Sequence, residues 1–231
     1  MLKIKNMLIV AIAIASFSTN SFAGSVGLGV TGSFAIVEAA GSEITEGTET
    51  GDTSLREATA SNSAVIGSLF AEYIFDNNVA LGFDFVPGKA DVNQKDLART
   101  DVTADAAEAV QDDGKNTAQA EVSNHITFYA EVPVHAGLYV KAGYVEMDVK
   151  TKEKSDVTTR SAYGDTKVDG ILFGGGYKND FGTNGYYKVE GTHTQFDTLK
   201  LSSAANTELK SNTISADLDV TKLTFGLGYK F

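Results

Sequence analysis

The sequence predicts an all-β fold, an antiparallel up-and-down barrel of about eight strands that crosses a membrane. Residues 220–231 alternate apolar or aromatic side chains with small or polar ones, which is typical of a strand with one apolar face. Similar segments recur along the chain, joined by connections that are alternately long and short. After the N-terminus, no window approaches the roughly twenty apolar residues of a transmembrane helix. A membrane-embedded chain of this kind must therefore span as a closed barrel, which satisfies its backbone groups in lipid.

The first 23 residues have the three parts of a secretory signal peptide. Lys3 and Lys5 form the positive start, residues 7–17 the apolar core, and Ser21-Phe22-Ala23 a small-x-small cleavage site. A retained membrane anchor is the alternative, but the apolar run is too short to span a bilayer as a stable helix. We expect a signal peptide at residues 1–23 and one barrel domain at residues 24–231.

The composition excludes several classes of site. The chain has no Cys, which excludes disulfides, thiolate metal sites and anchoring through an N-terminal lipidated Cys. Without Lys3 and Lys5, 17 of the 19 basic residues remain, against 30 acidic ones. This excess of negative charge argues against binding to nucleic acid, whose phosphates require a basic surface.

The first half of the chain contains three expected strands. Residues 25–37 alternate clearly, and the polar residues 38–62 form an expected long loop. Strands at 63–75 and 79–86 then form a hairpin around a tight Asp-Asn-Asn turn at 76–78. The next connection, residues 87–119, is the longest, and part of it, residues 95–110, is compatible with a short surface helix.

The second half of the chain contains the other five expected strands. Strands at 120–132 and 137–149 flank a short turn at 133–136, and residues 150–167 form a charged loop. Strands at 169–178 and 186–199 follow, joined by a turn at 179–185. The alternation weakens at 193–196, which indicates either a β-bulge or a misassigned register in this strand. A loop at 201–212 precedes the closing strand, residues 220–231. On these strands we expect a set of side chains to face lipid: Leu28, Val30, Leu81, Phe83, Phe128, Val140, Phe173, Phe225 and Leu227.

The whole segment 24–231 resembles the small bacterial outer-membrane β-barrel superfamily, of the OmpA and OmpX transmembrane type. Short turns on one side and long loops on the other are typical of such barrels, and so is a closing strand that ends on an aromatic residue. The resemblance implies a monomer in the outer membrane of a Gram-negative cell, surrounded by lipid and lipopolysaccharide. It also implies that the barrel-assembly machinery reads an assembly signal in the closing strand: Leu223, Phe225, Leu227, Tyr229 and Phe231.

Charged side chains on the opposite strand faces predict how the lumen is filled. Buried ionisable groups are costly unless they are paired, and an eight-stranded barrel encloses a space that side chains fill. We therefore expect an ion-pair network that closes the lumen: Glu72, Asp84, Glu131, Lys141, Lys188, Glu190 and Lys222.

Two patterns in the sequence imitate catalytic or cofactor sites. Residues 27–32 match G-x-G-x-x-G, but this dinucleotide fingerprint requires a preceding strand and a following helix. Small residues lining a narrow lumen explain these glycines better. The histidines His125, His135 and His193 have no ligand spacing for a metal. Ser123 and Thr127 share a strand face with His125, which is weak evidence for a hydrolytic set because geometry defines such a set.

We therefore expect no catalytic residue, no metal and no cofactor. The leading expectation is a structural or surface-interaction barrel with a largely plugged polar lumen and four long extracellular loops. The alternative is a small, low-conductance channel for ions or small solutes, and a third possibility is a barrel enzyme that modifies lipid A.

Overall fold

The computed structural model describes residues 24–46, 53–91, 98–101, 114–155, 163–202 and 213–231. The signal peptide expected at residues 1–23 lies outside these ranges. The described residues form ten strands of one antiparallel sheet. They are β1 (Gly24–Glu46), β2 (Thr53–Phe75), β3 (Ala80–Asp91), β4 (Ala98–Asp101), β5 (Gly114–His135), β6 (Leu138–Ser155), β7 (Thr166–Phe181), β8 (Gly185–Phe196), β9 (Leu199–Ser202) and β10 (Thr213–Lys230).

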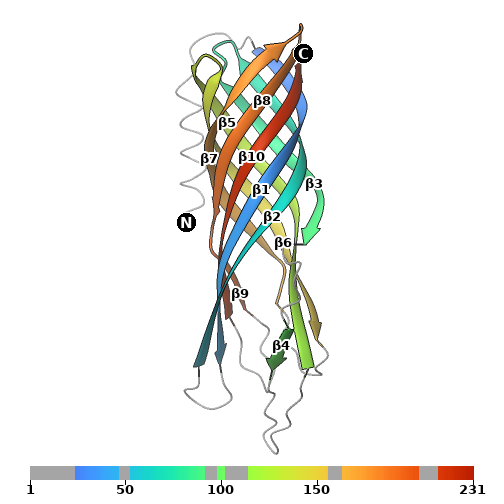
Figure 1. Ribbon diagram of the computed structural model, residues 1–231, viewed down its shortest axis with the longest axis vertical. Coiled ribbons are helices and arrows are strands. Elements are labelled where there is room, and N and C mark those ends of the chain that lie inside the picture. The colour runs from blue at the N-terminus through green and yellow to red at the C-terminus, as the bar shows by residue number, and fades with distance from the viewer. Residues whose placement is uncertain (1–23, 47–52, 92–97, 102–113, 156–162, 203–212) are drawn as a thin grey trace, which may run out of the picture.

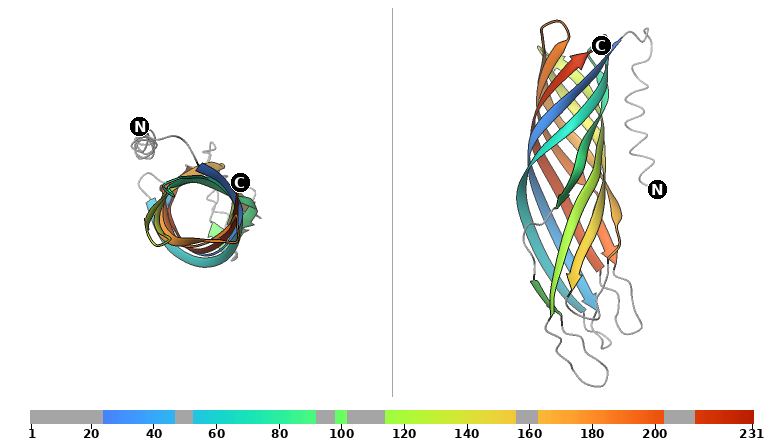
Figure 2. Two further views of the ribbon diagram at one scale, coloured as in Figure 1. Left: turned by 90° about the horizontal axis from the view of Figure 1, so that it is seen from above. Right: turned by 90° about the vertical axis from the view of Figure 1, so that its right-hand side faces the viewer.

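The sheet closes into a ring of the eight long strands. Each long strand pairs with the next in the order β1, β2, β3, β5, β6, β7, β8 and β10, and β10 pairs with β1 from Gly27–Lys230 to Ile44–Thr213. The end-on view in Figure 2 shows the closed ring, and Figure 1 shows the strands tilted around its axis. β4 and β9 are short additions that pair with β5 and β10. The predicted all-β up-and-down barrel of about eight strands is confirmed.

Alternation along the strands places apolar side chains outside and small or polar ones inside. On β1, Leu28 and Val30 are exposed, whereas Ser33 and Ala35 are buried. Eight of the nine side chains expected to face lipid are exposed, at 44–56% of their area, and Leu81 is partly buried. Because the outer face is apolar along all eight strands, the exposed belt matches a lipid environment rather than water. Among the described residues, no helix is long and apolar enough to cross a membrane.

Two ends of the barrel can be distinguished by their connections. The short-turn end has turns near residues 76–79, 136–137 and 182–184, and the N-terminus of β1 and the C-terminus of the chain also lie there. At the long-loop end, pairing extends far beyond the predicted strand ends. β1 and β2 pair from Gly24–Phe75 to Glu46–Thr53, so most of the loop expected at 38–62 is strand. β6 likewise runs to Ser155 and β10 begins at Thr213. The expected loops were too long because backbone pairing continues with polar side chains on both faces.

The turns agree with the sequence at 76–78 and differ at 133–136. β5 continues to His135, and the turn is formed by Ala136 and Gly137, with φ of 50° and 83°. Positive φ at both central residues is the geometry of a tight two-residue hairpin. Pro133 lies at an irregularity in the β5–β6 register, a position that tolerates its missing N–H.

Two further predictions about local structure were wrong. No register shift occurs at residues 193–195, where β8 pairs without interruption with β7 and β10. The alternation weakens there because the lumen is apolar at this level. Phe196 belongs to its apolar cluster and has 6% of its area exposed. The helix expected at 95–110 is contradicted by strand β4 at 98–101, and its other residues lie outside the described ranges.

Besides the irregularity at Pro133, two register shifts occur on β3 and β5. One lies between Val86 and Lys89, where Gly88 has a φ of 96°, and the other between Ser123 and Ile126, where Asn124 has a φ of 52°. β2 and β3 pair only from Leu69–Phe85 to Ile74–Ala80. Beyond Leu69 toward the long-loop end, β3 stays with β5 and no described residue of β3 pairs with β2, which leaves a seam in the wall.

The lumen has three layers. Near the short-turn end it contains charged and aromatic side chains, and in the middle it contains hydroxyl groups. Toward the long-loop end it contains an apolar cluster of Val145, Met147, Val149, Val168, Leu172 and Phe196. The sequence pattern does not reveal this last layer, because a strand with apolar residues on its inner face loses the alternation that marks the outer face.

Candidate functional site

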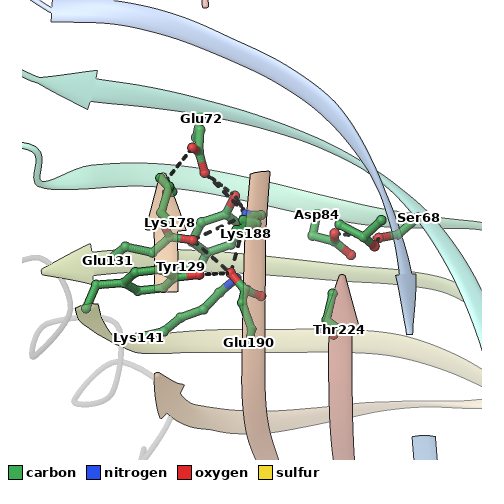
Figure 3. A network of polar contacts seen from close by, with 12 residues as sticks. Ser68, Glu72, Asp84, Tyr129, Glu131, Lys141, Lys178, Lys188, Glu190 and Thr224 are labelled. Atoms are coloured by element: carbon green, nitrogen blue, oxygen red, sulfur yellow. Dashed lines mark hydrogen bonds and ion pairs between the residues drawn. The ribbon is translucent and has the colours of Figure 1, made fainter. Parts of the chain in front are cut away.

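The charged layer of the lumen is the most distinctive group of polar side chains in the described structure. Its members come from β2, β5, β6, β7 and β8 and converge on the barrel axis (Figure 3). They comprise three carboxylates and three amines: Glu72, Glu131, Glu190, Lys141, Lys178 and Lys188.

Lys188 is the centre of this layer. Its side chain is 1% exposed, and its Nζ lies 3.4 Å from Glu72, 3.3 Å from Glu131 and 3.4 Å from Glu190. Its Nζ also lies 4.0 Å from the centre of the Phe70 ring, so an aromatic face contacts the same ammonium group. One cation is therefore shared by three carboxylates from three different strands.

Lys141 and Lys178 hold the same carboxylates from the sides. Lys141 Nζ donates to both oxygens of Glu190, at 3.0 and 2.9 Å, and lies 3.5 Å from Glu131. Lys178 Nζ donates to Glu72 at 2.7 Å and to Glu131 at 2.5 Å. Glu72 and Glu190 thus each contact two lysines and Glu131 contacts all three, and the layer as a whole is neutral.

Two tyrosines complete the hydrogen bonding. The Tyr129 hydroxyl donates to Glu72 at 2.9 Å, and the Tyr139 hydroxyl donates to Glu190 at 2.6 Å. Lys141 Nζ also lies 3.8 Å above the Tyr129 ring, a cation–π arrangement. A buried ion-pair network is tolerated when its remaining donors and acceptors are satisfied in this way.

The structure brings five of the seven predicted lumen residues into this layer, and Asp84 and Lys222 lie apart from it. Asp84 accepts a hydrogen bond from Ser68 at 2.6 Å, and Ser68 also contacts Thr31. Lys222 has no hydrogen-bond or ion-pair partner among the described residues. Both Asp84 and Lys222 line a small internal cavity of about 20 Å³ in the middle of the lumen.

Lys178, Tyr129 and Tyr139 are members that the sequence analysis missed. Lys178 was expected at the end of a strand, beside a turn. Its side chain points inward because it has the same phase as Gly174 and Gly176. These two glycines lie on the lumen face, where they pair with Thr192 and Glu190 of β8. Lys178 continues that phase and therefore lies inside, and β7 runs on to Phe181. Tyr129 and Tyr139 lie on inner faces, but the carboxylates that accept from their hydroxyls belong to strands that do not pair with theirs, so sequence alternation could not identify them.

Glycines on the inner faces make room for the large side chains of this layer. A Cβ at Gly228 would lie 2.5–2.6 Å from atoms of the Tyr186 ring and hydroxyl, and a Cβ at Gly82 would lie 2.6 Å from Tyr129. Gly27 and Gly29, from the G-x-G-x-x-G match, face Tyr186 and Phe70 in the same way. These residues belong to a strand with no helix after it, so the match has a packing explanation.

The hydrolytic set considered in the sequence does not assemble. The register shift at Asn124 lies between Ser123 and His125, and His125 Nδ1 has no hydrogen-bond partner among the described residues. On the outer surface, His193 Nδ1 lies 3.0 Å from Thr221 Oγ1, but its Nε2 is 4.0 Å from Asp219, which is too long for a hydrogen bond. The described residues contain no cluster of His, Asp and Glu that could hold a metal.

The residues of the expected assembly signal lie on the outer face of β10. Leu223, Phe225, Leu227 and Tyr229 are 44–63% exposed, and the Tyr229 and Phe231 rings stack edge to face at 5.0 Å. The N–H of Phe231 donates to the carbonyl of Val26 at 2.9 Å, just beyond the last strand residue. The last aromatic residue is thus fixed to β1 at the short-turn end.

Comparison with known proteins gives a fold and little more. No protein-family model and no curated protein matches the chain. Among solved structures, the outer membrane protein OprG from Pseudomonas aeruginosa is 13% identical, with a TM-score of 0.50 over 92% of this chain and 98% of that one. The outer membrane protease OmpT from Escherichia coli is also 13% identical, with a TM-score of 0.49 over 93% of this chain and 99% of that one.

Proposed function

We propose, from the premise that this chain has the fold of the small bacterial outer-membrane β-barrels, that it is a closed barrel with a structural and surface-interaction role. In this proposal, the long-loop end lies outside the cell and the short turns face the periplasm, as in other such barrels. The lumen is plugged, and the strands that extend beyond the membrane present the contact surface.

The charged layer is the observation that carries the proposal. Its six ionisable groups contact one another across the lumen, and Glu72, Glu131 and Lys188 have 3% or less of their area exposed. A hydrated ion that entered here would have to separate paired groups inside a narrow barrel, which leaves unpaired buried charges. The apolar cluster at the other end of the lumen supports the same view, because apolar constrictions resist wetting.

The extended strands support a role at the cell surface. The run of large apolar side chains on β1 is interrupted after Ile36, where Glu38 follows on the same exposed face, and the next large apolar residue on it is Ile44. β1 and β2 remain paired from there to Glu46 and Thr53. A rigid polar hairpin of this length has no use within the bilayer, whereas outside it would hold a recognition surface at a fixed distance from the membrane.

The proposal includes the surroundings of the barrel. Outer-membrane lipid and lipopolysaccharide would cover the apolar belt, the barrel-assembly machinery would bind the closing strand, and the barrel would remain a monomer. We propose no catalytic role. This is supported by the shift that separates Ser123 from His125 and by the distance of 4.0 Å between His193 and Asp219.

Single-channel recording in planar bilayers tests the plug against the alternative of a small channel. We expect the wild-type barrel to show only small, intermittent conductance. Lys141→Ala and Lys222→Ala should raise it, because each removes a cation from the lumen. Lys167→Ala is the matched control, since Lys167 pairs with Glu146 on the outer surface at 2.7 Å. Steady and large conductance of the wild type would overturn the plug and support the channel.

A further inference from the structure

A free strand edge runs along β2 at the long-loop end of the barrel. One side of β2 pairs with β1 along its whole length, from Phe75 to Thr53. On the other side, the pairing with β3 stops at Leu69, which lies opposite Phe85. β3 then follows β5 alone, and Figure 1 shows β2 running on toward the long loops after β3 has ended. Beyond Leu69, no described residue pairs with this side of β2.

The direction of the backbone groups on β2 follows from its hairpin with β3. The N–H of Phe75 donates to the carbonyl of Val79 at 2.8 Å, so the backbone groups of Phe75 point to the β3 side. Successive residues of a strand direct these groups to opposite sides, and the β1–β2 register has no shift. Every odd-numbered residue of β2 therefore directs its N–H and C=O to the β3 side. Ser63 agrees with this alternation, because its N–H donates to the neighbouring Asn62 side chain at 2.9 Å.

Residues 53–61, which we call the β2 edge, lie beyond the apolar belt. Ser61 pairs with Glu38, where a charged residue interrupts the apolar run of β1. Residues 57–61 are exposed on both faces of the strand, and most of their side chains are small. Proteins commonly protect such edges with Pro, Lys, a bulge or a covering segment. The β2 edge contains neither Pro nor Lys, and its ladder with β1 has no bulge, so it is open to a partner.

The chemistry of the β2 edge selects an extended polypeptide. A row of outward N–H and C=O groups at strand spacing is matched by the backbone of another extended chain, which adds a strand to the sheet. The charge of the paired segments 38–46 and 53–61 adds a second condition. They contain four glutamates and one arginine: Glu38, Glu43, Glu46, Glu57 and Arg56. A basic segment complements this net negative charge, whereas an acidic segment is repelled.

A second copy of the chain does not fit this edge. Two barrels inserted in one membrane point the same way, so their β2 strands also run the same way along the membrane normal. Strands in such barrels are tilted by about 35–45°, so two β2 strands that met edge to edge would cross at roughly twice that angle. Neighbouring strands in a sheet differ by only about 20–25°. The partner is therefore a segment of a different protein.

We propose that the β2 edge binds an extended, basic peptide segment of another protein by strand addition. This inference rests on the surface-interaction role proposed above and names the class of partner. The two proposals fail separately. A conducting lumen would refute the plug without affecting the edge, and absence of peptide binding would refute the edge without opening the lumen.

Fluorescence anisotropy of a labelled probe peptide tests the inference on the full barrel in lipid nanodiscs. The probe has about ten residues that alternate threonine and valine, which favours an extended chain, with lysines at both ends. We expect it to bind the wild type. The same peptide with alternate backbone nitrogens methylated should not bind, because it keeps the charge but loses ladder donors. Equal binding of both peptides, or binding of neither, would overturn the proposal.

A proline variant tests the backbone contact from the side of the barrel. Ser61→Pro removes one donor from the β2 edge and leaves the β1 ladder intact, since the Ser61 N–H points away from β1. Ser61→Ala is the matched control, because it keeps this N–H. We expect Ser61→Pro to weaken binding of the probe about tenfold, because a ladder hydrogen bond is lost and the ring obstructs the added strand. Equal affinities of the two variants would contradict strand addition at this position.

Hydrogen exchange measured by NMR gives a second readout that depends on position. In the free barrel, the amides of Glu57, Thr59 and Ser61 should exchange quickly, whereas those of Ala58 and Ala60, which point to β1, should exchange slowly. The probe peptide should slow exchange in the first set only. Slow exchange of the first set in the free barrel would overturn the proposal, because the edge would already be occupied by the chain itself or by a second copy.

Discussion

Lys141 on β6 donates to both carboxylate oxygens of Glu190 on β8, at 3.0 and 2.9 Å, across the intervening strand β7. The two strands do not pair with each other, so this contact crosses the curved inner wall of the barrel rather than following a ladder. Glu190 also accepts from Tyr139 and lies 3.4 Å from Lys188. The carboxylate is therefore held from three sides, and the barrel wall is cross-linked inside its own lumen.

Lys141→Met should destabilise the folded barrel by about 3 kcal/mol, because removing one partner of a buried pair leaves uncompensated charge on the other. Urea unfolding of the barrel in lipid vesicles measures this change. Lys167→Met is the control, since Lys167 makes its ion pair with Glu146 at the solvated outer surface, where such pairs contribute little. Equal effects of the two variants would show that the lumen contact is no stronger than a surface one.

Gly228→Ala should destabilise the barrel by about 1–3 kcal/mol, because the added methyl group would overlap with the fully buried Tyr186. Gly191→Ala is the matched control, as a Cβ there has no atom within 4 Å. The same unfolding measurement compares the two variants. Tyr186→Leu in the Gly228→Ala background should recover part of the loss. Failure of this recovery would contradict a direct clash.

Phe225→Arg should cost about 2–4 kcal/mol in lipid, because Phe225 lies in the middle of the exposed apolar run of β10 and Arg is costly at the bilayer midplane. Thr221→Arg, on the same face but beyond that run, should cost much less. Refolding into vesicles of defined thickness followed by chemical unfolding measures both. If Phe225→Arg is tolerated as well as Thr221→Arg, the belt does not face lipid at this depth.

Deletion of Phe231 should reduce the amount of barrel inserted in the outer membrane of cells while export continues. Its ring packs on Tyr229 and its N–H binds Val26, so the closing strand would lose its terminal aromatic and one backbone contact to β1. Immunoblots of outer-membrane and periplasmic fractions measure the outcome. Normal insertion of the deletion variant would contradict an assembly role for this residue.

The sequence by itself determined the class of fold, the outer face and the short turn at 76–78. Period-two alternation survives in any sheet, so Leu28, Val30 and Phe225 could be assigned to the outside without knowing their neighbours. The same reasoning placed Glu72, Glu131 and Glu190 inside. It failed at 193–196, where Phe196 belongs to an apolar part of the lumen and the two faces no longer differ in polarity.

Only the tertiary structure decided which inward side chains meet. Glu72 and Lys188 are separated by 116 residues in sequence and come within 3.4 Å because the ring closes and the strands tilt. Lys178 joined the same layer because it continues the inward phase of Gly174 and Gly176, whereas Asp84 and Lys222 line a cavity in the neighbouring hydroxyl layer. Alternation fixes the face on which a side chain lies, whereas the register and tilt of strands that are distant in sequence fix its depth, and depth decides its partner.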